Sequence, residues 1–349
     1  MVNTRRRVRP LTSPFPPALL LSLILPVLVL FTGCPKSEGP DNSRVGVSVR
    51  PSGEPSHTSP IPDGVAFNGE RAMDHVRKQL EFGPRIPGSS ELAKTREYIV
   101  NQLKSSGLAV STDEFTASTP VGEKRMVNIT AEYPGETKDV IIIASHYDTK
   151  LFKDMYFVGA NGPGASVGAL LELGRVLGGS KAKAKLTYWL VFFDGEEAFC
   201  EGWDECGKLG APDNTYGSRH YVSQLKGKNE VGRVRALILL DMMGYKKLEL
   251  GRDTMSTRWL QDILWQTGGE LGYGAYFVDR PEGVGGDDHE PFLQAGIDSV
   301  DLIQLNDYPY WHKADDTLDK ISAKSLKIVG DVVLASLPRI EQHALQQSR

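Results

Sequence analysis

The spacing of hydrophobic residues predicts where regular structure begins. From near residue 66, apolar residues recur at every fourth position, which is the spacing of one helix face, and Gly83-Pro84 then ends the segment. The repeat consists of Ala72, Val76 and Leu80. A second helix is expected at about residues 90–103. The folded part of the chain is therefore predicted to start near residue 66.

Farther along the chain, strand-like runs alternate with helical stretches. The strand-like runs are residues 126–132, 140–145, 186–193 and 234–240. The helical stretches are residues 165–177 and 216–225, and a closing helix is expected at about 323–345. This alternation indicates an α/β fold with a largely parallel central sheet and helices on both faces. We therefore predict one α/β domain over residues 66–349.

The first 34 residues have the layout of a signal peptide. Arginines near the start precede an apolar run at residues 18–31, which is short for a ~20-residue membrane span and is interrupted by Pro26. Residues 30–34 resemble the bacterial lipobox, which implies that Cys34 becomes the lipidated first residue. We expect an exported lipoprotein of the bacterial cell envelope. An uncleaved anchor is the alternative, and it also places the domain outside the cytoplasm.

Residues 35–65 are predicted to be a disordered tether between this segment and the domain. They are rich in Pro, Ser and Gly and almost lack apolar periodicity, so they cannot bury enough surface to offset chain entropy. The net charge of −4 over 349 residues gives no general attraction to nucleic acid. We therefore expect no nucleic-acid partner.

Two cysteines follow Cys34, at positions 200 and 206. An oxidising compartment favours a disulfide that closes a short loop between them. Their separation permits the bridge without requiring it, so two free thiols remain the alternative. Two thiols alone do not make a zinc site.

Polar residues follow the apolar strands at three places, and the Trp311-His312 pair comes later in the chain. The three groups are His146 with Asp148, Asp194 with Glu196 and Glu197, and Asp241. In open α/β sheets the ligand crevice lies outside the carboxyl ends of the strands, so these groups are expected to converge. A single acid there would indicate only a turn or a helix cap, whereas repetition indicates a site.

The chemistry of these side chains points to a metal. His146, Glu197, Asp241 and His312 offer nitrogen and oxygen donors that suit zinc. Adjacent acids do not easily bind one ion together, so one of Glu196 and Glu197 can bind metal while the other transfers protons. A solvated acidic turn is the alternative for this pair taken alone.

These motifs resemble peptidase family M28 and, within it, the glutaminyl-peptide cyclotransferase branch. The similarity extends over residues 82–312, nearly all of the predicted domain. It includes Ser-His-Tyr-Asp-Thr-Lys at 145–150, Phe-Phe-Asp-Gly-Glu-Glu-Ala-Phe at 192–199, Tyr-Gly-Ser-Arg-His at 216–220 and Asp-Asp-His at 287–289. The resemblance implies a zinc-aminopeptidase-like fold with a mixed central sheet, and one zinc in the cyclases against two in the aminopeptidases.

The resemblance also implies roles for particular residues. Glu197 and His312 match zinc ligands, and Glu196 matches the general acid/base. Asp241 and Asp287 match acids that support the proton relay.

The remaining matches concern the substrate and a second metal. Trp311 and, after a one-residue insertion, Trp203 match indoles that line the substrate pocket. His146 matches a ligand of the second metal in two-zinc aminopeptidases. Together with Asp148, it is a candidate for a second metal or for supporting the first.

One position departs from the family pattern. Gly162 stands where the family has a metal-ligating Asp, in a segment that aligns without gaps over residues 157–177. Glycine has no side-chain oxygen, and the Asn161 amide or a water would hold zinc more weakly than a carboxylate. The sequence therefore predicts a weakened metal site.

Three functions are compatible with these residues. The leading one is cyclisation of N-terminal glutamine to pyroglutamate with release of ammonia, in which one zinc polarises the γ-carbonyl and Glu196 shuttles the proton. The alternative is an M28-type zinc aminopeptidase, in which Glu196 deprotonates a metal-bound water. The third is a catalytically impaired, peptide-binding lipoprotein, suggested by Gly162. In each case the expected partners are peptide or protein N-termini and, through the lipid, a membrane.

Overall fold

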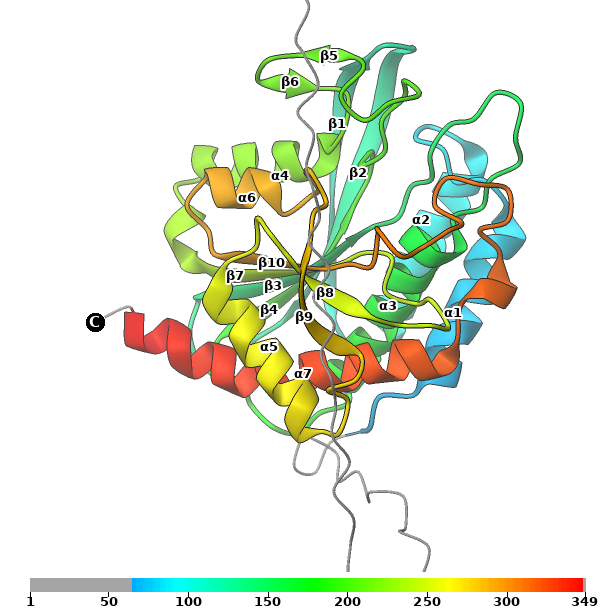
Figure 1. Cartoon of the computed structure of the whole chain (residues 1–349). Coiled ribbons are helices and arrows are strands. Elements are labelled where there is room, and N and C mark those ends of the chain that lie inside the picture. The colour runs from blue at the N-terminus through cyan, green and yellow to red at the C-terminus, as the bar shows by residue number, and fades with distance from the viewer. Residues whose placement is uncertain (1–64, 348–349) are drawn as a thin grey trace, which may run out of the picture. The chain divides into compact units, whose positions relative to one another are not determined.

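A six-stranded sheet lies at the centre of the computed structural model, which describes residues 65–347 (Figure 1). Its strand order is β1-β2-β4-β3-β7-β10. The strands are β1 (Ala109–Thr119), β2 (Gly122–Tyr133), β3 (Val140–His146), β4 (Thr187–Phe193), β7 (Val234–Leu240) and β10 (Ser299–Leu302). The predicted signal peptide with Cys34, and all but the last residue of the predicted tether, lie outside the described residues.

The sheet is mixed, with three parallel pairings among β4, β3, β7 and β10 and two antiparallel pairings that add β2 and β1. The α/β fold is confirmed, although "largely parallel" overstates the parallel share. Sequence analysis missed β1 because this edge strand is largely exposed and polar, and it missed β10 because that strand is only four residues long. The predicted ranges of β3, β4 and β7 agree with the structure to within one residue.

Helices cover both faces of the sheet. On one face lie α1 (Gly69–Phe82), α2 (Ser90–Ser105), α3 (Ala165–Gly178), α5 (Arg258–Glu270) and α7 (Ala323–Gln347). On the other face lie α4 (Tyr216–Gly227) and α6 (Glu290–Gln294). Successive strand residues point to opposite faces, so Ile141 and Ile143 pack with the first group of helices, whereas Val140 and Ile142 pack with the second.

The first helix shows how local sequence sets an element's limits. The Asn68 side chain accepts hydrogen bonds from the first backbone amides of α1. The helix ends at Gly83, whose φ of 92° lies in the region that favours glycine. The helix predicted from the apolar repeat is therefore confirmed, together with its end.

Smaller elements complete the described chain. The π-helical turn η1 (Ala160–Gly164) leads into α3, and the 3-10 turns are η2 (Val231–Arg233) and η3 (Leu318–Lys320). Two short pairs stand outside the main sheet, β5 (Gly207–Lys208) with β6 (Ala211–Pro212) and β8 (Leu250–Asp253) with β9 (Phe277–Glu282). Among residues 65–347, the helices are too short or too polar to cross a membrane.

Candidate active site

The carboxyl ends of β3, β4 and β7 meet at one edge of the sheet. His146 is the last residue of β3, Glu196 and Glu197 follow β4 closely, and Asp241 directly follows β7. These residues line one cavity of about 210 Å³ together with His312, from the loop before α7. The convergence predicted from the sequence is therefore confirmed, and the cavity also takes in Asp287, Trp203 and Trp311.

The loop that carries Glu196 and Glu197 is anchored through its backbone. Both oxygens of the buried Asp148 accept backbone N–H groups, that of Glu196 at 3.1 Å and that of Glu197 at 3.3 Å. The amide of Thr215 donates to the Glu196 carbonyl at 2.8 Å. The Lys150 ammonium donates to the carbonyls of Ala198 and Cys200, at 2.8 and 2.9 Å. Asp148, a candidate for supporting a metal, thus fixes the two acids in place.

Glu197 and His312 lie in direct contact in the cavity. The His312 Nε2 atom lies 3.2 Å from one Glu197 carboxylate oxygen and 3.3 Å from the other. Burial would raise the pKa of Glu197, but the His312 imidazole opposes this and lowers the pKa to about 2. Glu197 is therefore held as an anion, the form that binds metal.

The pKa of Glu196 shifts in the opposite direction. Burial raises the pKa of its carboxyl well above the usual value, and the carboxylates of Glu197 and Asp287 add to the rise, while His146 opposes it. The His146 Nδ1 atom lies 3.5 Å from a Glu196 oxygen. Neighbouring acids with pKa values pushed apart are typical of an acid/base pair with divided roles.

Asp241 and Asp287 surround this pair with further buried carboxyl groups. An Asp241 oxygen lies 3.4 Å from His146 Nε2 and lacks a hydrogen-bond partner. Burial, together with the charge of Asp241, raises the pKa of Asp287 to about 6. These acids therefore make the surroundings of Glu196 negative, which favours its protonated form.

Asp287 also belongs to a second cluster of buried side chains. The ligand atoms of Asp287, His289 and Asp301 all lie within 4.8 Å of one another, and His289 Nε2 lies 3.2 Å from an Asp253 oxygen. Burial raises the pKa of Asp301 well above its usual value, and nearby carboxylates add to the rise. The cluster extends the network of acids away from the cavity.

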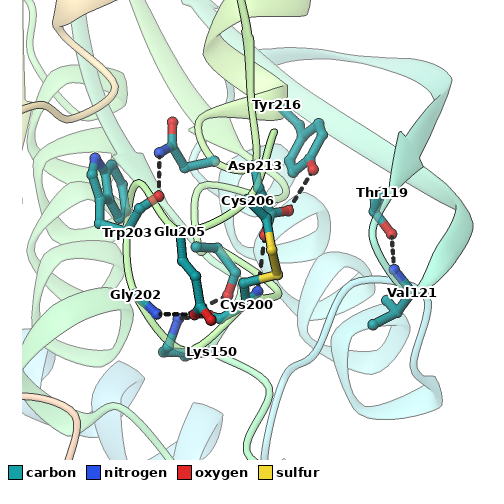
Figure 2. The surroundings of a disulfide bond; sticks show 12 residues. Thr119, Val121, Lys150, Cys200, Gly202, Trp203, Glu205, Cys206, Asp213 and Tyr216 are labelled. Carbon is teal, nitrogen blue, oxygen red and sulfur yellow. Dashed lines mark hydrogen bonds between the residues drawn. A yellow bond between two sulfur atoms is a disulfide. The ribbon is translucent and has the colours of Figure 1, made fainter. Parts of the chain in front are cut away.

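Aromatic rings form part of the cavity wall. The Trp311 ring is stacked on the His312 imidazole at a centroid distance of 4.4 Å, and Phe157 meets the imidazole edge-on at 5.8 Å. Trp203 lines the cavity from a loop closed by a disulfide between Cys200 and Cys206 (Figure 2). The sequence left the bridge and two free thiols open, and the structure has the bridge.

Unusual backbone geometry is concentrated here. Three of the four described non-glycine residues with positive φ are Thr215 (48°), Met242 (46°) and His312 (52°). Met242 and His312 line the cavity, and the Thr215 amide holds the Glu196 carbonyl. Strained backbone persists where its surroundings fix it, and it is common at functional sites.

Comparisons with known proteins agree with this geometry. A model of peptidase family M28 matches residues 128–337, more than half of the chain. The crystal structure of a glutaminyl cyclase from an Acidobacteriales bacterium is 35% identical, covers 84% of this chain and 100% of its own, and has a TM-score of 0.74. The chain belongs to the glutaminyl-peptide cyclotransferase branch of peptidase family M28.

Two other relatives of this M28 chain are informative. A glutaminyl-peptide cyclotransferase-like protein of Bos taurus is 31% identical over 267 residues, which is 67% of this chain and 66% of the bovine protein. The chain thus spans slightly less than two thirds of the bovine protein. A Zn-dependent exopeptidase from Parabacteroides distasonis is 25% identical, covers 77% of this chain and 97% of its own, and has a TM-score of 0.71.

Gly162, for which the sequence predicted a departure from the family pattern, lines the cavity. A Cβ atom on Gly162 would lie 3.6 Å from an Asp241 oxygen and 3.7 Å from His146 Nε2, both ordinary contact distances. Both polar atoms of the neighbouring Asn161 side chain already have backbone partners. Its amide donates to the Met242 carbonyl, and its oxygen accepts the Gly244 amide.

Glu197 and His312 are the two protein residues that would hold a zinc ion here, one fewer than catalytic zinc sites usually have. Glu197 and His312 supply a carboxylate and an imidazole, both common zinc ligands. Among residues 65–347, no third His, Cys, Asp or Glu joins them in a group whose ligand atoms all lie within 4.8 Å of one another.

Sequence reasoning missed some residues of this M28 site. Lys150 is the last residue of the 145–150 motif, but nothing in the sequence indicated that it would be buried and would donate to the carbonyl of Ala198, next to Glu197. Asp316 lines the cavity, where burial raises its pKa to about 6 and where its carboxylate accepts a hydrogen bond from the backbone N–H of Asn161. Asp204 also lines the cavity, and only its position next to Trp203 could have pointed to it.

Proposed function

We propose that this M28 chain is a zinc-dependent glutaminyl-peptide cyclotransferase, which converts N-terminal glutamine of peptides to pyroglutamate and releases ammonia. The observation that carries the proposal is the pair of adjacent acids in one cavity, with Glu197 lying 3.2 Å from His312 and Glu196 lying 3.5 Å from His146. The likeness to glutaminyl cyclases in sequence and structure supports it.

The reaction needs one proton carrier close to both nitrogens. The α-amine of the substrate attacks the side-chain carbonyl carbon, a new C–N bond closes the ring, and the bond to the amide nitrogen breaks. Glu196, in its ionised form, takes the proton from the attacking amine and then gives it to the departing nitrogen, which leaves as ammonia. A raised pKa makes this carboxylate a stronger base. Zinc held by Glu197 and His312 supplies polarisation of the γ-carbonyl when it is bound.

Neighbouring groups support Glu196 in this role. The Asp148 carboxylate fixes the backbone of Glu196, so the side chain enters the cavity from a rigid loop. Burial, together with the charges of Glu197 and Asp287, raises the pKa of Glu196 above that of an ordinary carboxyl, which is the direction that favours proton transfer near neutral pH. Trp311, Trp203 and Phe157 form an apolar wall for the methylene groups of glutamine.

An aminopeptidase is the second candidate. His146 and Asp241 lie 3.4 Å apart in the same cavity and have unpartnered buried atoms, so they offer donors for a second metal. The likeness to a Zn-dependent exopeptidase supports this alternative. Gly162 counts against it, because the family residue at this position would bridge the two metals.

Two substrates separate these functions. The zinc-loaded domain should release ammonia from peptides that begin with glutamine and should leave leucine anilides uncut, because an anilide offers no γ-amide. Ammonia is measured by a coupled assay and aniline by absorbance. Cleavage of the anilide with no change to the glutaminyl peptide would replace the cyclase by the aminopeptidase. If the metal-loaded domain catalyses neither reaction, the result would favour a peptide-binding lipoprotein.

We further propose that the chain is exported and anchored in the cell envelope through a lipid on Cys34. The support is the run of arginines, the short apolar segment and the lipobox-like residues before Cys34. Cys34→Ser should shift the full-length protein from the membrane fraction to the soluble fraction, or leave it unprocessed, as judged by fractionation and mass spectrometry of the N-terminus. A wild-type protein that is soluble and carries no lipid would contradict this prediction.

A further inference from the structure

The loop between Cys200 and Cys206 combines a covalent closure with a place on the cavity wall. Trp203 and Asp204, in the middle of this loop, both line the cavity. The disulfide ties the two ends of the loop together (Figure 2). The residues between the two cysteines are exposed or half-buried, so no hydrophobic core of their own holds them.

A few polar contacts accompany the bridge. The Asn214 side-chain amide donates to the Trp203 carbonyl at 3.1 Å, and the Gly202 amide donates to the Glu205 carboxylate at 2.9 Å (Figure 2). The Trp203 indole nitrogen lies 3.4 Å from where a Cβ on Gly286 would stand, so the ring lies close to a second segment that lines the cavity. A covalent closure limits the conformations open to such a loop. The position of Trp203 and Asp204 therefore depends strongly on the bridge.

The catalytic pair does not depend on the bridge in the same way. Asp148 and Thr215 hold the backbone of Glu196 and Glu197, and Lys150 holds the carbonyl of Ala198. None of these contacts passes through the residues between the cysteines. Loosening the loop should therefore alter substrate binding and leave the acid pair in place.

Asp204 is the accessible acid of this cavity. The other carboxyl groups in the lining, such as Glu196 and Asp287, are buried, whereas Asp204 is exposed. Among the described residues that line the cavity, there is no Lys or Arg. The reacting glutamine has to enter first, so the residue that follows it stays near the exposed part of the wall. A carboxylate there attracts a basic side chain and repels an acidic one.

We propose that the disulfide-closed loop is the specificity wall of the cavity, and that Asp204 selects peptides with a basic residue after the N-terminal glutamine. The proposal rests on the cyclase function. The bridge fixes the loop so that Trp203 contacts the side chain of the N-terminal glutamine and Asp204 lies near the second residue of the peptide. The two cysteines are therefore positioning residues.

The test compares two peptides that differ only in the second residue, Gln-Arg and Gln-Glu. For the zinc-loaded wild-type domain, kcat/KM should be roughly two- to tenfold higher for Gln-Arg, as expected for one exposed charge pair. Asp204→Asn should bring the ratio close to one. Glu201→Gln is the matched control, because Glu201 is an exposed acid of the same loop that does not line the cavity, and it should keep the wild-type ratio.

The bridge is tested in the same assay. The double variant C200S/C206S should raise KM several-fold for both peptides and reduce the ratio, with zinc content unchanged and kcat changed less than about twofold. An unchanged KM would show that the bridge is not needed. A wild-type ratio of one, or an equal loss of the ratio in Glu201→Gln, would overturn the role of Asp204.

Binding separates this inference from the proposed function. Calorimetry with Glu196→Gln measures the affinity for both peptides without turnover. If neither peptide is cyclised by the wild-type domain but Gln-Arg binds more tightly, the cyclase function fails and the specificity wall stands. If both peptides are cyclised equally and bind equally, the cyclase function stands and the specificity wall fails.

Discussion

Glu196→Gln should reduce turnover of glutaminyl peptides by about 10²- to 10⁴-fold while the domain keeps its zinc. The reason is that glutamine has the shape of glutamate but cannot carry a proton between the attacking and departing nitrogens, and loss of a general acid/base typically costs this factor. This corresponds to roughly 3–5 kcal/mol in the activation barrier. Steady-state kinetics and metal analysis on the same preparation measure both quantities.

Variants of the neighbouring residue provide the contrast. Glu197→Gln and His312→Ala should lose the metal itself, because Glu197 and His312 face each other across 3.2 Å as the two protein ligands. If Glu196→Gln lost its zinc while Glu197→Gln kept it, the roles of the two adjacent acids would have to be exchanged.

Gly162→Asp should tighten zinc binding by about 100-fold or more. The substitution adds a third protein ligand, a carboxylate, to Glu197 and His312. Loss of a residue that only supports a ligand already lowers metal affinity about 10–100-fold, so a direct ligand should have at least this effect. The site has room, since the added Cβ meets its neighbours at 3.6 Å or more. The φ of Gly162 is −67°, but its ψ of −106° lies outside the α and β regions that residues with a side chain favour, so both Gly162→Asp and its Ala control require a change in ψ. Competition with a chelator of known affinity measures the change.

Gly162→Ala is the matched control for this substitution. It adds the same Cβ without a ligand atom, so it should leave zinc affinity close to that of the unmodified domain. Unmodified protein that already retained one zinc against a strong chelator would contradict the assignment of two protein ligands. Equal tightening by Ala and Asp would show that the added atom acts on the loop and not on the metal.

The amino-acid sequence predicted the central strands and the converging acids well, for a physical reason. Buried parallel strands such as β3 and β7 are apolar along their whole length, and the polar residues after them necessarily meet at one edge of the sheet. The position of His146, Glu197 and Asp241 around one cavity followed from this rule.

Other features depend on contacts between distant segments, which no local pattern shows. The polar edge strand β1 is held by pairing with β2 over its full length. Asp148 was a candidate for supporting a metal, whereas its role as an anchor for the Glu196 backbone depends on a contact 48 residues away. The Asn161 amide was a candidate for replacing the missing ligand, but the backbone of Met242 and Gly244 engages it. The buried cluster of His289, Asp301 and Asp253 joins three separate segments in the same way.

The most direct test of the cyclase proposal is to measure bound zinc and pyroglutamate on one sample. The unmodified domain is titrated with zinc, and a peptide that begins with glutamine is followed by mass spectrometry at each step. The proposal predicts that loss of one ammonia from the peptide rises in proportion to the first equivalent of zinc and is absent in Glu196→Gln. Full zinc occupancy without this mass change, or the same mass change in Glu196→Gln, would contradict it.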